Sequence, residues 1–336
     1  MRKTNPRYKE WLKRRNITVF KRELKRRILR RRRFAQHPVD LKKSRIKIFD
    51  LPENFSLINN FEVVINTFKQ IQFEMKEKDF NYDQILLNMK NVNELTVDAL
   101  MYLLVFIKNA KNAHDRDVKI YGNLPKNVEC AKKVKESGFL DYLRTNIVRT
   151  DNNDNLKIIA GDEVESSVFK NICDFVHSKL GLDRKDTFEL YNSLGEIVGN
   201  SFEHAYINNV RWHKWLIFAK YENDYVKIVV LDTGLGIIET MKKRILGDVF
   251  FDEKDLLKSA LNGENRSETK LLYRNRGLPR LRQNTLNGIL KNMTLFSNNV
   301  LYKYRESDKI EVYSTTESSL KGTLYYFEFS NNGGKV

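Results

Sequence analysis

The stretch that most constrains the fold is an almost continuous run of β-forming residues from Val226 to Leu231, typical of a buried strand. Asp232 ends this run, and Gly234 and Gly236 follow it. A carboxylate in this position can accept a hydrogen bond from a ligand amine. The glycines let the backbone approach the same ligand without a Cβ in the way. We therefore expect a ligand at the end of this strand.

A helical pattern precedes the strand, from about Asp186 to Asn208. Its apolar face consists of Leu190, Leu194, Ile197, Val198 and Phe202. On a second face Glu196, Asn200 and His204 follow one another at intervals of four residues. A Glu one turn from an Asn can hold an attacking water with one side chain and Mg²⁺ with the other. This spacing is common in helices, so it indicates a site only in combination with Asp232, Gly234 and Gly236. We expect His204 to cap or pack near the site.

Two further motifs lie downstream. Arg274, Asn275 and Arg276 lead into Gly277 and Leu278, which open a helical segment running from Pro279 to Leu290. A glycine at a helix start leaves free N–H groups where phosphates could bind, and a proline is tolerated in the first turn. Gly322 and Thr323 then precede a strand over 324–329.

Taken in this order, these motifs resemble the GHKL ATPase superfamily with its Bergerat fold, over residues 162–331. This superfamily includes type II topoisomerases, mismatch-repair ATPases, the ninety-kilodalton heat-shock chaperone, sensor histidine kinases and anti-sigma-factor kinases. The resemblance implies a mixed sheet covered on one face by helices. It also implies ATP and Mg²⁺ as ligands.

The resemblance assigns a role to each motif residue. Glu196 would be the catalytic general base, and Asn200 would hold Mg²⁺. Asp232, with Thr323 beside it, would accept from the adenine amino group. The remaining nucleotide-binding residues would be Gly234, Gly236 and Ile237 at the adenine, and Arg276, Gly277 and Leu278 at the phosphates.

The lid and one departure also follow from the resemblance. Residues 261–276, including Arg274, would form the mobile lid over ATP. Pro279 removes one backbone N–H from the phosphate motif, so we expect Arg280 or Arg282 to substitute for it.

The segment 44–150 alternates between strand and helix patterns, which predicts parallel strands joined by crossover helices. Strands are expected near 45–49, 82–89 and 118–121, and helices near 61–78, 97–110 and 127–137. Residues 80–145 resemble a STAS domain, the fold of anti-sigma-factor antagonists. At the phospho-acceptor position of that family only Thr96 offers a hydroxyl, so we expect a scaffold or interaction role. Turn-forming residues at 150–161 predict the domain boundary.

Positive charge is concentrated at the N-terminus. Residues 1–50 carry 20 Lys/Arg and 4 Asp/Glu, which is +16 of the net +17. Residues 1–43 therefore form a basic arm, and Phe20, Leu24 and Ile28 predict an amphipathic helix within it. Nucleic-acid phosphate is one expected partner of the arm, and an acidic protein surface is the other.

The whole chain is expected to be of the α/β (α+β) class. Cys130 and Cys173 form no disulfide or metal framework, so the sequence predicts a cytoplasmic protein, and no apolar run predicts a membrane span or a signal peptide. We expect an ATP-binding, Mg²⁺-dependent ATPase that acts as a nucleotide-controlled regulatory module, such as a bacterial or phage regulatory or defence protein. An anti-sigma-factor-like Ser/Thr kinase and a non-catalytic nucleotide sensor are the alternatives. A homodimer also stays open.

Overall fold

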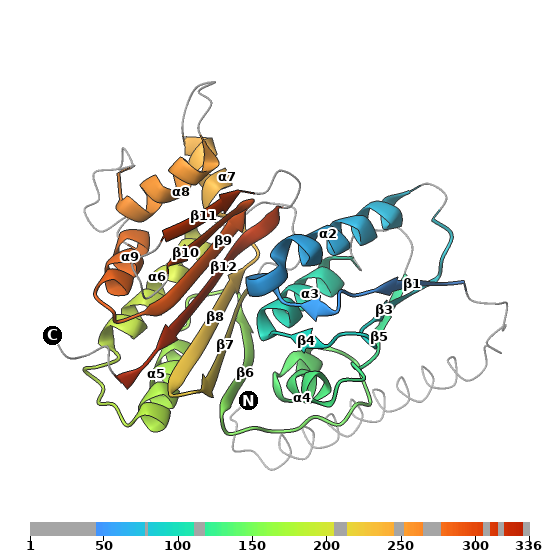
Figure 1. Cartoon of the computed structure of the whole chain (residues 1–336), viewed down its shortest axis with the longest axis horizontal. Coiled ribbons are helices and arrows are strands. Elements are labelled where there is room, and N and C mark those ends of the chain that lie inside the picture. Colours follow the sequence, from blue (N-terminus) through green and yellow to red (C-terminus); the bar gives the residue numbers. More distant parts are fainter. Residues whose placement is uncertain are drawn as a thin grey trace, which may run out of the picture. The chain divides into compact units, whose positions relative to one another are not determined.

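The computed structural model describes residues 45–77, 80–110, 118–204, 214–244, 252–264, 277–304, 310–314 and 319–331. By its contacts the chain divides into residues 1–45 and Ile46–Val336. The expected arm, residues 1–43, lies outside the described residues. The account below concerns the second unit, which is a mixed α/β structure, as the sequence predicts (Figure 1).

The N-terminal part of this unit is a small parallel α/β structure. Its sheet has the order β1-β3-β5, with both pairs parallel. The strands are β1 (Ile46–Asp50), β3 (Gln84–Asn88) and β5 (Lys119–Gly122), and a second pair joins β2 (Asn54–Phe55) to β4 (Glu94–Leu95). The helices are α2 (Leu57–Lys76), α3 (Val97–Ala110) and α4 (Val128–Glu136). The predicted alternation of strand and helix with parallel pairing is confirmed.

Local sequence signals account for several of these helix ends. Ser56 accepts a hydrogen bond from the amide of Asn59 at the start of α2, and Asn127 accepts from Cys130 at the start of α4. After α4 the chain turns at Gly138, whose φ of 82° lies in the left-handed region that favours glycine. A short 3₁₀ turn, η1 (Phe139–Tyr142), follows.

The C-terminal part contains a seven-stranded sheet in the order β11-β10-β9-β12-β8-β7-β6. The strands are β6 (Asn155–Gly161), β7 (Trp215–Glu222), β8 (Tyr225–Asp232), β9 (Lys291–Asn298), β10 (Val300–Tyr304), β11 (Ile310–Ser314) and β12 (Leu320–Phe329). Every adjacent pair is antiparallel, so the expectation of a mixed sheet is wrong. The β7–β8 and β9–β10 connections are tight hairpins, which impose antiparallel pairing. Asn223 and Asp224, both with positive φ, form the first.

Five helices pack on one face of this sheet (Figure 1). They are α5 (Ser166–Leu180), α6 (Phe188–His204), α7 (Ile237–Arg244), α8 (Glu253–Asn262) and α9 (Gly277–Leu286). Alternate strand residues such as Ile217, Ile228 and Val230 join the helices in one hydrophobic core.

The other face of the sheet packs against the N-terminal α/β part. Leu216, Val229 and Leu231 point to this side and belong to the same hydrophobic core as α2 and α3. The rings of Phe61 and Phe296 lie 4.9 Å apart across this contact. Strand β8 is therefore buried on both faces, which explains its nearly continuous apolar sequence.

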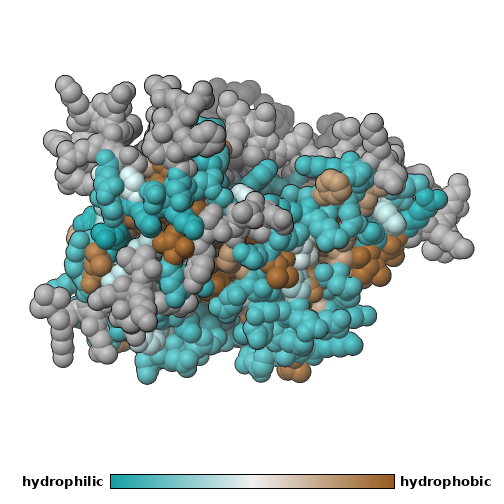
Figure 2. Space-filling view, turned by 45° about the horizontal axis from the view of Figure 1, so that its top comes forward, coloured by the Kyte–Doolittle hydropathy of each residue, from teal (hydrophilic) through white to brown (hydrophobic). Residues whose placement is uncertain are grey.

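Strand β6 lies inside the segment where the sequence predicts a boundary. Its pairing with β7 means that the large sheet begins before residue 162. The space-filling view shows hydrophobic residues as separate groups among hydrophilic ones (Figure 2). Among the described residues, no helix is both long enough and apolar enough to cross a bilayer.

Candidate functional site

Asp232 is the buried carboxylate at the end of β8, with 6% of its surface exposed. Its Oδ1 accepts a hydrogen bond from the amide of Gly234 at 2.8 Å. Thr323 is its partner in the β12 register, and the side chains of Thr323 and Ser201 lie near the carboxylate. The hydroxyl of Ser201 donates to the carbonyl of Ile197 at 3.0 Å. Burial raises the pKa of Asp232 to about 6, although these neighbouring polar groups favour the charged form. The carboxylate therefore changes charge close to neutral pH.

Two glycines bring backbone close to this carboxylate. Gly322 has a φ of 103°, and a Cβ there would lie 1.9 Å from the backbone oxygen of Asp232. Gly236 has a φ of 86°, and its Cβ would lie 2.4 Å from Oδ1 of Asn298. Both positions therefore require glycine for conformation and for space. The atoms that require glycine at position 236 are those of the Asn298 side chain and the carbonyl oxygen of Gly322.

The first turn of α7 is fixed from the end of β9. The amide of Ile237 donates to Oγ of Ser297 at 2.7 Å, and the amide of Glu239 donates to Oδ1 of Asn298 at 3.3 Å. Asn298 also donates from Nδ2 to the carbonyl of Leu235 at 2.8 Å. Side chains some sixty residues away thus cap this helix and hold the loop after Asp232.

Sequence reasoning missed Ser297 and Asn298. Asn298 and Asn299 read only as a turn between two strands, and Asn298 has the positive φ that such a turn needs. Nothing in the local pattern indicates which distant helix these side chains contact.

The start of α9 lies against the helix that carries Glu196 and Asn200. A Cβ on Gly277 would lie 2.9 Å from Oε2 of Glu196 and 3.0 Å from Nδ2 of Asn200. Gly277 is buried, and the two α6 side chains are half-buried. Only a residue without a side chain lets the start of α9 approach them this closely. Glu196, Asn200 and Gly277, which are expected to act together, therefore meet in the structure.

Polar contacts fix α9 to α6 further along both helices. Nε of Arg280 lies 3.1 Å from Oε2 of Glu189. Nδ2 of Asn284 donates to Oγ of Ser193 at 3.0 Å and to Glu189 at 3.3 Å. The Arg280 guanidinium is thus held in an ion pair with Glu189. Arg282, the other residue expected to substitute at the phosphates, lines a separate cavity described below.

These contacts form two groups that meet on α6. Glu196 and Asn200 contact Gly277, and the next residue, Ser201, lies near the carboxylate of Asp232. Ser201 was not singled out from the sequence, because a serine in a helix usually carries no functional signal. The C-terminal half of α6 therefore connects the end of β8 with the start of α9.

The remaining expected site residues fall partly inside and partly outside the described range. Gly234 and Leu278 are at their expected places, beside Asp232 and in the first turn of α9. Arg274, Arg276 and the lid segment 265–276 lie outside the described residues, as does the side chain of His204. The start of the expected lid is regular helix, since Leu261 and Asn262 end α8 and Gly263 turns the chain at a φ of 72°.

The residues at this site suit a metal ion that is held mainly by the phosphates of a bound nucleotide and only in part by the protein. Among the described residues no group of three or more His, Cys, Asp or Glu could hold a metal ion. Mg²⁺ commonly binds one or two protein groups and the phosphates of a nucleotide, so the Asn200 amide is compatible with it. No protein-family model matches this chain, and no curated protein sequence matches it either.

Proposed function

We propose that the chain binds Mg·ATP between α6, the end of β8 and the start of α9, and hydrolyses it as a GHKL-type ATPase. The observation that carries this proposal is the close approach of Gly277 to Glu196 and Asn200, with Ser201 of the same helix near the carboxylate of Asp232. In the same proposal the helix-covered sheet is a Bergerat-type domain, and the parallel part before it is STAS-like.

Asp232 would recognise the adenine. Its carboxylate is a hydrogen-bond acceptor that is charged above about pH 6, and an exocyclic amine is a donor that fits it. Hydrogen bonds from Gly234 and Thr323 fix the orientation of the carboxylate before a ligand arrives. Ser297 and Asn298 hold the loop with Gly234, Gly236 and Ile237 in place for the ring.

Glu196 and Asn200 would act at the phosphates. Mg²⁺, when bound, neutralises charge on the β- and γ-phosphate oxygens. Asn200 offers its amide oxygen to the metal, and Glu196, one helical turn away, can accept a proton from the attacking water. The first turn of α9, from Gly277 through Leu278, would present backbone N–H groups to the phosphates.

The test is ATP binding and phosphate release by the full chain with Mg²⁺. We expect saturable binding, and we expect Glu196→Gln to lower phosphate release at least a hundredfold while binding persists. Glu165→Gln is the matched control, because this exposed glutamate lies at the start of α5 and should leave turnover unchanged. Absence of saturable binding would refute the nucleotide site, and turnover that survives in Glu196→Gln would refute the role of that residue.

The same assay separates the two alternatives. Binding without turnover in the wild-type chain would identify a nucleotide sensor. Transfer of label from γ-labelled ATP to protein would identify a kinase. Thr96, at the position that the STAS resemblance gives to the phospho-acceptor, is a poor acceptor for such transfer, because its hydroxyl is buried.

A further inference from the structure

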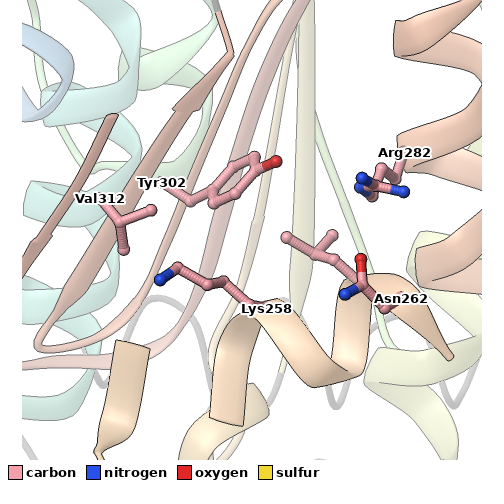
Figure 3. Close-up of a pocket in the computed structure, with 6 residues that line it drawn as sticks. Lys258, Asn262, Arg282, Tyr302 and Val312 are labelled. Carbon is pink, nitrogen blue, oxygen red and sulfur yellow. The ribbon is translucent and has the colours of Figure 1, made fainter. Parts of the chain in front are cut away.

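A cavity of about 460 Å³ lies apart from the proposed nucleotide site, between α8, α9 and the strands β10 and β11. Lys258, Leu261 and Asn262 line it from α8, Arg282 from α9, and Tyr302 and Val312 from the sheet (Figure 3). Arg282, a phosphate candidate from the sequence, is among these, whereas Glu196, Asn200, Asp232 and Gly277 are not. Its volume is typical of a small-molecule pocket.

The described charges lining the cavity are positive. The guanidinium of Arg282 lies near the hydroxyl of Tyr302, and Figure 3 shows this hydroxyl directed toward Arg282. No ion pair found between described residues includes Arg282. Lys258 has only an exposed contact with Asp255, 3.4 Å away on the same helix. The other acid beside the lining is Glu264, which accepts from Nδ2 of Asn262 at 2.8 Å.

The floor of the cavity is apolar and firmly packed. Tyr302 and Val312 are register partners on β10 and β11, so they lie side by side on the helix-covered face of the sheet. Tyr302 and Leu261 are both buried, and the neighbouring Tyr304 belongs to the same core. A ligand here would therefore meet a rigid hydrocarbon and aromatic surface below two cationic side chains.

We propose that this cavity binds a small organic anion, a phosphate monoester or carboxylate with a short apolar body. The Arg282 guanidinium presents paired donors that match either anionic group, and Lys258 adds a second charge from α8. The apolar body lies against Tyr302, Leu261 and Val312. The ligand connects α8 to α9, the helices at the two ends of segment 264–277. The proposal does not depend on the nucleotide site.

The test is calorimetric titration of the full chain with phenyl phosphate and with benzoate, which separates the two anionic groups. We expect at least one to bind saturably, with benzyl alcohol and inorganic phosphate each at least tenfold weaker. Lys258→Gln and Arg282→Gln should each lower the affinity at least tenfold. Lys170→Gln and Arg184→Gln, which remove the same charges from exposed positions near α5 and α6, should leave it unchanged.

Two further variants separate loss of probe binding from loss of folding, and separate this cavity from the proposed nucleotide site. Val312→Phe should fill the cavity and abolish binding without removing a charge, and thermal unfolding checks that each variant folds. Asp232→Asn should retain binding, because it alters only the proposed adenine contact. The proposal fails if neither probe binds, or if the probes bind equally well to Lys258→Gln, Arg282→Gln and Val312→Phe. Loss of probe binding in Asp232→Asn would also overturn it, by moving the probe to the nucleotide site.

Discussion

Asp98 in the parallel α/β part and Asp232 in the large sheet are both buried carboxylates whose pKa is raised by burial. Asp98 accepts hydrogen bonds from the amides of Leu57 at 2.8 Å and Ile58 at 3.0 Å, so its charge caps the start of α2. The carboxylate of Asp232 accepts from the amide of Gly234, and the side chains of Thr323 and Ser201 lie near it. The polar groups around Asp98 belong to the starts of α2 and α3, whereas those around Asp232 come from the loop after β8, from β12 and from α6.

This difference teaches that a buried acid is a candidate site when polar groups from distant segments gather around it. At Asp98 the neighbouring positions are apolar core residues, including Leu57, Ala99 and Leu100. At Asp232 the amide of Gly234 donates to the carboxylate, and Ser201 lies near it on the helix of Glu196 and Asn200. The first arrangement stabilises the fold, and the second arranges polar groups around one point.

The largest expected effect is on folding, at Asp98. Asp98→Ala leaves the amides of Leu57 and Ile58 buried without their acceptor, and we expect a loss of about 3 kcal/mol in the free energy of unfolding. Urea unfolding followed by circular dichroism measures this. Asp98→Asn keeps an acceptor oxygen and should lose less than half as much. Equal losses in the two variants would contradict the capping role.

At Asp232 we expect a substitution to raise the free energy of unfolding instead of lowering it. Its folded-state pKa of about 6 is above the ordinary pKa of 3.8 for this side chain, so its ionisation lowers stability as pH rises through that interval. Asp232→Asn removes this penalty, and at pH 7.5 the variant should gain about 1–2 kcal/mol in unfolding free energy. The same variant should lose ATP binding by at least a hundredfold. A destabilised variant that still binds ATP would break the comparison.

A smaller effect is expected from the caps of two helices. Asn298→Ala removes an acceptor from α7, and Asn127→Ala removes one from α4, so each should lower the unfolding free energy by about 1 kcal/mol. Only Asn298→Ala should also weaken ATP binding, by about tenfold, because only Asn298 holds the loop after Asp232. Similar ATP affinities in the two variants would remove Asn298 from the site.

The smallest effect is a pH dependence of ligand affinity. Because Asp232 accepts a hydrogen bond only when it is charged, adenosine affinity should fall by about tenfold between pH 7 and pH 5. Adenosine is the probe, since it lacks the titrating phosphates of ATP. Titration calorimetry at both pH values gives the ratio. A flat profile would show that the charge on Asp232 plays no part in recognition.

Much of the fold could be predicted because its elements carry local signals. The helix over 97–110 and the strand at 226–231 have strong apolar patterns and clear ends, and the structure has them at nearly the predicted bounds. The pairing of the large sheet could not be predicted in the same way. The hairpins at Asn223–Asp224 and Asn298–Asn299 set antiparallel pairs, but their turn residues look like ordinary polar loops in the sequence.

The candidate site shows the same distinction between residues with a local sequence signal and residues defined by distant contacts. Glu196, Asn200, Asp232 and Gly277 were singled out because their residue types and spacing carry chemistry. Ser201, Ser297 and Asn298 were missed, since their role depends on contacts with distant segments. The ion pair of Arg280 with Glu189 was missed for the same reason.

The most direct test of the account is a crystal structure of the full chain with Mg²⁺ and a non-hydrolysable ATP analogue. The account predicts the adenine amine within hydrogen-bond distance of Asp232, the metal on Asn200, and the phosphates at the start of α9 beside Gly277. A nucleotide bound instead in the cavity with Arg282 and Tyr302, or electron density at neither place under saturating ligand, would contradict it.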